Sequence, residues 1–187
     1  MRRRLFLTGP IGCGKSTLIA NALGSSVRLA GGFLTLRVVE GGRLAGFDLA
    51  APCGQPRERF LSFGAGGVVR DERPFTRTAP ALLRQAAERR FAVLDEIGGF
   101  ELLYPDFYEA LTRFFFSGTP CVGVLKALPG AEELRRRVQL PEEYLEAARE
   151  LRELLAGDPD TTLLETTGRY DLNAEGALRH WAEEYAV

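Results

Sequence analysis

A glycine-rich segment near the N-terminus has the residue spacing of a phosphate-binding loop. Residues 9–16 match the pattern G-x-x-x-x-G-K-[ST] at every fixed position. The glycines at positions 9, 12 and 14 allow the backbone to turn its N–H groups toward an anion. Lys15 is placed to contact the β- and γ-phosphates of a nucleotide, and the Ser16 hydroxyl is placed to ligate Mg²⁺. We therefore expect this P-loop to bind a nucleoside triphosphate together with Mg²⁺.

Two adjacent carboxylates follow an apolar segment further along the chain. Residues 91–94 predict a strand that is buried on both faces, and Asp95 and Glu96 come directly after it. The carboxyl end of such a strand opens into the crevice where open α/β sheets bind ligands. We expect Asp95 to hold Mg²⁺ through its water shell, opposite Ser16. We expect Glu96 to be the general base or the group that orients the attacking water, which makes Glu96 and Lys15 the predicted catalytic residues.

Phosphoryl transfer also needs positive charge beside the γ-phosphate, and an arginine is the usual source. Arg73 and Arg77 lie in a polar loop before a predicted helix and are our candidates for an arginine finger; Arg37 and Arg43, on a predicted hairpin, are alternatives. The run of arginines at residues 135–137 is interpreted as the solvated face of a helix. Lys15 and Lys126 are the only lysines of the sequence, so both merit attention.

The elements around these residues alternate between strands and helices. Residues 5–8 predict a strand that enters the P-loop, and residues 33–39 and 43–49 predict a β-hairpin, with a further strand at 59–63 and a glycine loop at 64–67. Further strands are predicted at residues 91–94, 120–125 and 161–166. Helices are predicted at residues 15–23, 80–90, 104–116, 131–138, 142–155 and 174–185. This order predicts an α/β fold in which a mostly parallel sheet is covered by helices on both faces and carries an inserted antiparallel hairpin.

Three stretches of the sequence resemble one family, the thermophile-type nucleoside-triphosphatases, a P-loop family that is also found in animals. The first is the P-loop. The second is the hairpin at residues 32–48, which is similar to the family's glycine-phenylalanine-threonine strand, short turn, arginine and glycine-phenylalanine. The third is residues 94–102, similar to its aspartate-glutamate-isoleucine-glycine segment. The sequence departs from the family at Gly99 and Phe100, where lysine and methionine are usual, and at residues 166–169, where a short asparagine-arginine motif is expected.

The resemblance implies a RecA-like P-loop fold and slow Mg²⁺-dependent hydrolysis of ATP, GTP and other nucleoside triphosphates. It also implies nucleotide contacts in two segments. In the P-loop these are Gly9, Pro10, Ile11, Gly12, Cys13, Gly14, Lys15, Ser16 and Thr17. In the later segment they are Asp95, Glu96, Ile97, Gly98, Gly99, Phe100, Glu101 and Leu102.

Composition bounds the class of protein. The 187 residues are 45% hydrophobic and 26% charged, which is typical of a globular domain, and the net charge of -1 argues against nucleic acid as a partner. The three cysteines lack CxxC spacing, and no apolar run reaches the ~18 residues of a membrane-spanning helix. We expect one cytoplasmic domain over residues 1–187 with no targeting segment, with the hairpin inserted at about 32–63 and a pair of helices at about 128–157.

Two other functions use the same motifs. A small-molecule or nucleotide kinase would need an acceptor pocket and a mobile lid, and the helices at residues 128–157 are a candidate lid. A nucleotide-gated binding module would bind nucleotide tightly and depend on a partner for turnover. The pair Asp95 and Glu96 favours the hydrolase, because a carboxylate after the magnesium aspartate is suited to polarising water.

Overall fold

One eight-stranded sheet organises residues 2–168 and 170–186, which are the residues that the computed structural model describes. Across the sheet the strands lie in the order β5 (Gly67–Arg70), β4 (Arg57–Gly64), β3 (Arg43–Ala50), β2 (Gly31–Glu40), β6 (Ala92–Ile97), β7 (Cys121–Leu125), β1 (Arg4–Thr8) and β8 (Thr161–Glu165). The long helices are α1 (Lys15–Leu23), α2 (Ala79–Ala86), α3 (Pro105–Phe116), α4 (Leu128–Val138), α5 (Glu143–Gly157) and α6 (Leu172–Tyr185). Single-turn helices lie at η1 (Gly24–Leu29), η2 (Pro74–Thr78) and η3 (Phe100–Leu103).

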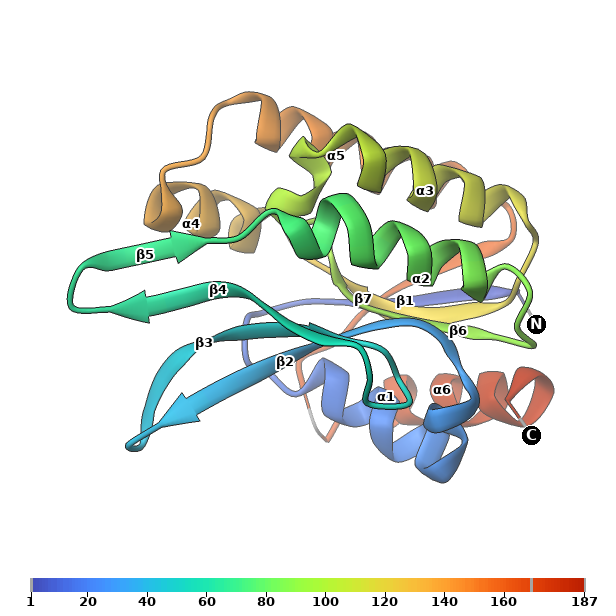
Figure 1. Cartoon of the computed structure of the whole chain (residues 1–187). Helices are drawn as coiled ribbons and strands as arrows, with labels where there is room; N and C mark the ends of the chain where they lie inside the picture. The colour runs from blue at the N-terminus through green and yellow to red at the C-terminus, as the bar shows by residue number, and fades with distance from the viewer. Residues whose placement is uncertain (1, 169, 187) are drawn as a thin grey trace.

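The strands from β2 to β8 across the sheet are parallel, and helices cover both of their faces. The helices α1 and α6 lie below the sheet, and α2, α3 and α5 lie above it (Figure 1). Strand β1, which lies between β7 and the edge strand β8, is buried on both sides, with Leu5 and Leu7 in the lower core beside Trp181. Phe6 points into the upper core, where its ring meets that of Phe115 edge-to-face at 6.2 Å. The predicted α/β architecture is confirmed.

The strands β2 to β5 form an antiparallel extension of the same sheet. Strand β2 joins the two parts, because residues 31–33 pair in parallel with β6 and residues 34–40 pair antiparallel with β3. Gly32 is needed at this junction: its φ is 84°, and a Cβ there would lie 2.2 Å from the carbonyl oxygen of Val93. The predicted hairpin is present, with β4 and β5 paired beyond it.

Two boundaries differ from those predicted. The glycine segment at residues 64–67 was expected to be a loop, but Gly64 and Gly67 pair with each other as the ends of β4 and β5, so only a two-residue turn lies between them. The strand β5 itself was not predicted. The helix expected at residues 80–90 ends as α2 at Ala86, because Glu88 and Arg89 donate to carbonyls three residues back and tighten the chain into a turn before β6.

The remaining helices lie where the sequence indicates them. The two helices expected within residues 128–157 are α4 and α5, which pack on each other, and α5 also contacts β8. Helix α6 begins at Asp171, whose carboxylate accepts hydrogen bonds from the backbone N–H groups of Asn173 and Ala174. Among the described residues, no helix is both long and apolar enough to span a bilayer.

Candidate active site

The P-loop connects the buried end of β1 to the first turn of α1. Gly9, Gly12 and Gly14 have φ values of 143°, 74° and 102°, which are conformations that favour glycine. A Cβ on Gly9 would lie 2.3 Å from the carbonyl oxygen of Thr166, so this glycine also allows the loop to pack on the chain after β8. No side chain caps α1, and its first turn carries no acidic residue. The positive end of this helix is therefore open to an anion.

The ammonium of Lys15 lies over the loop itself. The side chain is buried, and its Nζ donates to the carbonyl oxygens of Gly9 at 3.1 Å and Pro10 at 2.6 Å. These weak neutral partners hold the charge at the position where the phosphates of a nucleotide would lie. Lys15 is therefore poised to exchange loop carbonyls for phosphate oxygens.

A hydrogen bond joins the P-loop to the carboxyl end of β6. Ser16 Oγ donates to Asp95 Oδ1 at 2.7 Å, although the two residues are 79 positions apart in sequence. On the other side of this carboxylate, the backbone N–H of Thr35 donates to Asp95 Oδ2 at 3.4 Å, and the Thr35 hydroxyl donates to the carbonyl oxygen of Asp95 at 3.1 Å. The predicted pair Ser16 and Asp95 is thus brought together, and β2 helps to hold it.

The Asp95 carboxylate is buried, and among the described residues no cationic side chain forms an ion pair with it. Burial raises the pKa of Asp95 to about 7, and the charge of Glu96 acts in the same direction, whereas the hydrogen bonds from Ser16 and Thr35 and the charge of Lys126 oppose the rise. In a magnesium site of this kind the protein supplies two ligands, one hydroxyl and one carboxylate, and phosphate oxygens complete the coordination. The residues present therefore fit Mg²⁺.

Glu96 lies next to a lysine that is distant in sequence. The φ of Glu96 is 62°, which is uncommon for a residue other than glycine. Glu96 lies where the pairing of β6 with β7 is irregular. Its Oε2 accepts from Lys126 Nζ at 2.9 Å. Burial raises the pKa of Glu96, but the charge and hydrogen bond of Lys126, together with the charge of Lys15, hold it below its ordinary value. Glu96 is therefore an ionised carboxylate, as a proton acceptor must be.

The segment after Glu96 is folded around its own glutamate. Glu101 Oε1 accepts from the backbone N–H groups of Gly98 at 2.8 Å and Gly99 at 2.7 Å, and Tyr144 donates to the Gly98 carbonyl at 2.9 Å. Burial raises the pKa of Glu101 despite these hydrogen bonds. The predicted nucleotide-contact residues of this segment fall into two groups. Gly99, Phe100 and Glu101 line the cavity described next, whereas the side chains of Ile97 and Leu102 are in the core.

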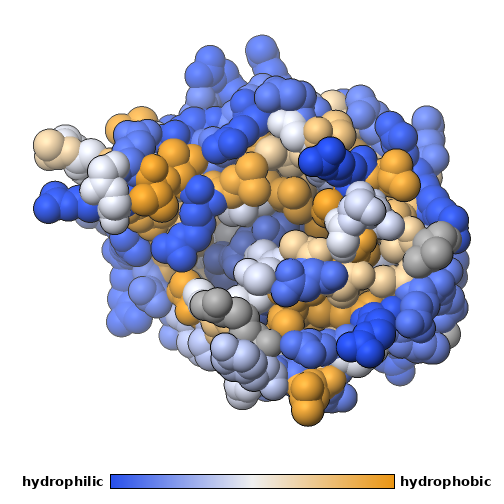
Figure 2. Space-filling model, turned by 90° about the horizontal axis from the view of Figure 1, so that it is seen from below, coloured by the Kyte–Doolittle hydropathy of each residue, from blue (hydrophilic) through white to orange (hydrophobic). Residues whose placement is uncertain are grey.

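One cavity of about 420 Å³ connects the P-loop to Glu96 and continues beneath the antiparallel extension. Figure 2 shows the molecule hollowed on its lower face, with hydrophobic residues gathered around the hollow. Its P-loop wall comprises Ile11, Gly12, Gly14, Lys15, Ser16 and Thr17. Its remaining polar side chains include Thr35, Arg37, Glu96, Glu101, Lys126, Glu133 and Arg137. Six phenylalanines give the cavity an aromatic part: Phe33, Phe47, Phe60, Phe63, Phe75 and Phe100.

Comparison with known proteins decides the family. A family model described as "NTPase" matches residues 4–156. This chain belongs to the NTPase family. The human cancer-related nucleoside-triphosphatase is 35% identical over 161 residues, which cover 73% of this chain and 85% of that protein. Nucleoside-triphosphatase THEP1 of Thermococcus kodakarensis is 33% identical over 140 residues, which cover 67% of this chain and 77% of that protein.

Solved structures agree with this assignment. The solution structure of a human cancer-related nucleoside triphosphatase superposes with a TM-score of 0.63 at 26% identity, over 97% of this chain and 96% of that one. The crystal structure of THEP1 from Aquifex aeolicus superposes with a TM-score of 0.62 over 98% and 99% of the two chains, and at 21% identity it supports the fold alone. The resemblance to the thermophile-type family, inferred from three motifs, is confirmed, and so is the P-loop fold.

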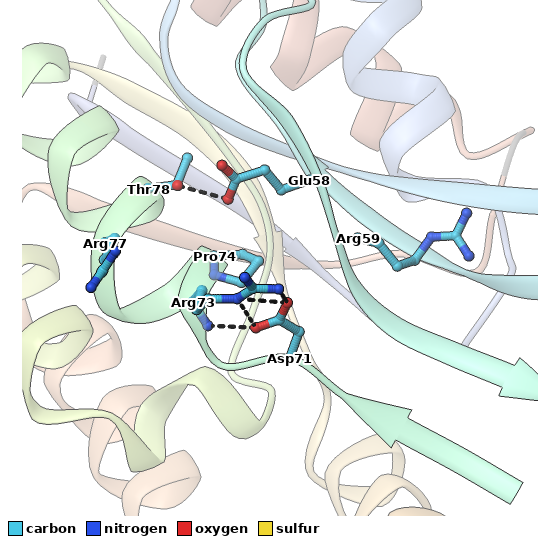
Figure 3. Close-up of a pocket in the computed structure, with 7 residues that line it drawn as sticks. All are labelled: Glu58, Arg59, Asp71, Arg73, Pro74, Arg77 and Thr78. Atoms are coloured by element: carbon cyan, nitrogen blue, oxygen red, sulfur yellow. Dashed lines mark hydrogen bonds and ion pairs between the residues drawn. The ribbon is translucent and has the colours of Figure 1, made fainter.

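In this NTPase the two predicted arginine-finger candidates lie outside the P-loop cavity. Arg73 and Arg77 line a separate pocket of about 460 Å³ (Figure 3). Arg73 Nε donates to both carboxylate oxygens of Asp71, at 2.9 and 3.0 Å, and this pairing lowers the pKa of Asp71. Arg77 lies apart from that pair in Figure 3. The structure therefore does not bring either arginine to the phosphate site.

Three other basic residues line the cavity instead. Arg37 was an alternative candidate, and Lys126 drew attention only because lysine is rare in this sequence. Arg137 was interpreted as part of a solvated helix face and is exposed, and in addition its guanidinium lies 5.0 Å from the centre of the Phe63 ring. That contact depends on how α4 packs against β4, which local sequence does not reveal. The departure from the family motif at residues 166–169 is described as far as Gly168, and Arg169 lies outside the described residues.

Proposed function

We propose that the protein hydrolyses nucleoside 5′-triphosphates, including ATP and GTP, to the diphosphate and phosphate in a Mg²⁺-dependent reaction. The observation that carries this proposal is the 2.7 Å hydrogen bond from Ser16 to Asp95, with Glu96 as the next residue. It joins a phosphate-binding loop to a carboxylate that would ligate the metal, beside a second carboxylate that would accept a proton. The related proteins named as nucleoside-triphosphatases support the same class of reaction.

Ser16 and Asp95 would hold the magnesium ion in this proposal. Among the described residues there is no cluster of three or more histidines, cysteines and acids that could hold a metal ion. This suits Mg²⁺, which often binds through one or two protein ligands together with substrate phosphates and water. When bound, the ion neutralises charge on the β- and γ-phosphate oxygens. The remaining roles belong to the chain itself.

The chain positions the phosphates and prepares the attacking water. The P-loop N–H groups and the open end of α1 hold the phosphate chain, and Lys15 exchanges the carbonyls of Gly9 and Pro10 for the β- and γ-phosphates. Glu96 orients a water molecule toward the γ-phosphorus and accepts its proton. Lys126 keeps Glu96 ionised and in place.

The expected partner is a free nucleotide in the cytoplasm. A net charge of -1 offers no broad basic field for a nucleic-acid backbone.

Phosphate release from the purified protein tests this function. The assay covers ATP, GTP, CTP, UTP and the deoxyribonucleotides, each with Mg²⁺ and again with the metal chelated. We expect steady release that stops on chelation. Tight nucleotide binding with no release under any condition would contradict the proposal and favour a partner-dependent binding module.

A further inference from the structure

The aromatic part of the cavity lies on the γ-phosphate side of the site. In a P-loop the lysine contacts the β- and γ-phosphates, and the serine would hold Mg²⁺ next to them. Because Ser16 bonds to Asp95, the γ end of a bound nucleotide faces Asp95 and Glu96. The strands that carry Asp95 and most of the phenylalanines lie on one side of β1 in the sheet, and β8 lies on the other. A nucleotide held in this way directs its γ-phosphate toward the rings.

The aromatic chamber, defined as the space lined by Phe47, Phe60, Phe63, Phe75 and Phe100, has a preformed wall. Phe60 and Phe75 meet edge-to-face at 4.9 Å, and Phe75 and Phe100 meet at 5.6 Å. Phe47 stacks on Phe60 at 6.2 Å and stays half-buried, as does Phe63. Arg137, on α4, lies over the Phe63 ring. Phe60, Phe75 and Phe100 are buried, so the two half-buried rings, Phe47 and Phe63, are the surface on which a flat ligand can stack.

Hydrolysis does not need this chamber. A water molecule occupies about 30 Å³ and requires polar partners, which Glu96 supplies. Small-molecule sites, by contrast, occupy about 300–1,000 Å³, are mostly apolar and have a few polar groups at one end. The cavity of about 420 Å³, part of which is the P-loop space for the triphosphate, has this composition, since its lining combines Thr35, Glu96 and Lys126 with the rings.

We propose that the aromatic chamber binds a second substrate, a planar aromatic molecule that carries a hydroxyl group, beside the γ-phosphate. Nucleosides are the class that combines a flat ring with a hydroxylated sugar. This inference rests on the proposed binding of a triphosphate at the P-loop and extends it from hydrolysis to transfer. Water takes the place of the acceptor when the chamber is empty.

The transfer step is balanced by groups already in the site. The acceptor hydroxyl gives its proton to the Glu96 carboxylate, and its oxygen forms a bond to the γ-phosphorus. The bond from that phosphorus to the bridging oxygen breaks, and the electron pair leaves with the nucleoside diphosphate. Lys15 neutralises the charge on the leaving phosphate. The products are a phosphorylated acceptor and a nucleoside diphosphate.

The test uses protein saturated with Mg²⁺ and β,γ-imido-ATP, titrated with adenosine, guanosine, cytidine and thymidine by calorimetry. We expect at least one nucleoside to bind without displacing the analogue. Phe47→Ala removes a half-buried ring of the chamber and should weaken that binding about tenfold or more. Phe116→Ala is the matched control, since this ring is 86% exposed on α3 and lines neither pocket, and it should leave the binding unchanged. With γ-labelled ATP in place of the analogue, the label should appear on the bound nucleoside.

The outcomes separate this inference from the proposed function. Analogue binding without binding of any of the four nucleosides would overturn the acceptor site alone. Displacement of the analogue by the nucleoside would also overturn it, because the chamber would then hold the base of the triphosphate itself. Equal nucleoside affinity in wild-type protein and Phe47→Ala would place the second site elsewhere. Failure of the analogue to bind at all would contradict both the acceptor site and the proposed function.

Discussion

At the carboxyl ends of β1, β6 and β7 the sheet presents charged and hydroxyl groups that contact one another, whereas β3 and β4 present aromatic rings to the same cavity. Ser16, Asp95, Glu96 and Lys126 are connected by contacts of 2.7 and 2.9 Å. The rings of the extension meet through van der Waals contact and line the same cavity. The parallel strands therefore carry the charged and hydroxyl groups of the site, whereas the antiparallel extension contributes mostly aromatic walls to the cavity.

Removal of the P-loop charge should give the largest effect on nucleotide binding. It changes the charged groups at the ends of the parallel strands and leaves the aromatic rings in place. Lys15→Ala deletes the only charged side chain within residues 9–17, so we expect loss of both triphosphate binding and turnover. Calorimetry with β,γ-imido-ATP measures the binding. Arg28→Ala, which removes an exposed cation from η1, is the control and should bind as the wild type does. Wild-type affinity in Lys15→Ala would show that the phosphates bind elsewhere.

The junction between the parallel strands and the antiparallel extension should be sensitive to a single methyl group. Gly32→Ala forces alanine to a φ of 84° and places its Cβ 2.2 Å from the Val93 carbonyl oxygen. We expect the free energy of unfolding to fall by about 2–4 kcal/mol, which exceeds the ~1–2 kcal/mol of left-handed backbone strain alone. Urea denaturation measures the change.

Gly41→Ala is the matched control for the junction. Its φ of 55° is also positive, but a Cβ there would meet nothing within 4 Å, so it should show the backbone strain without the clash. Equal losses in the two variants would mean that the close approach of β2 to β6 does not matter.

A smaller effect is expected from the ion pairs that hold the antiparallel extension together. Asp48 on β3 accepts hydrogen bonds from Arg57 and Arg59 on β4, at 2.7 and 2.5 Å. Burial raises the pKa of Asp48, but the two arginines outweigh it, so the folded-state pKa lies below the ordinary 3.8. Asp48→Asn should lower the unfolding free energy at pH 7 by about 1–2 kcal/mol, because the guanidiniums are more than a third exposed.

The pH dependence of that difference follows from the sign of the shift. A depressed folded-state pKa stabilises the protein above the unfolded-state pKa, and this stabilisation is lost as pH falls through the folded value. The gap between wild type and Asp48→Asn should therefore be constant from pH 7 to pH 5 and should shrink below pH 3.8. A gap that widened in acid would show that Asp48 is not held ionised by its arginines.

The sequence predicts the charged and hydroxyl groups at the ends of the parallel strands well, because the signals for these groups are local. Glycine spacing specifies the P-loop backbone, and an apolar strand followed by Asp95 and Glu96 marks the sheet edge where parallel strands end. The contact of Lys126 with Glu96 was out of reach, since it depends on an irregular register between β6 and β7. Rarity of lysine was the only signal.

The antiparallel extension and the contacts around it were predicted less well, because these contacts join separate elements. Strand β5 pairs with β4 next to the turn between Gly64 and Gly67, and the sequence there lacks the apolar alternation that would predict a strand. Arg73 was expected near the phosphates from its place before a helix, yet Asp71, two residues earlier, holds it in another pocket. Arg137 had no signal either, since its ring partner Phe63 lies on β4.

Single-turnover phosphate release by wild-type protein and Glu96→Gln, with nucleotide affinity measured in parallel, tests the central claim most directly. The substitution keeps the size of the side chain and removes the proton acceptor. We predict unchanged binding of Mg²⁺-ATP and a fall in kcat of ~10²-fold or more, with Glu109→Gln, an exposed site on α3, as the control that keeps full activity. Release by Glu96→Gln at the wild-type rate would contradict the assignment of Glu96 as the base and, with it, the mechanism built on the end of β6.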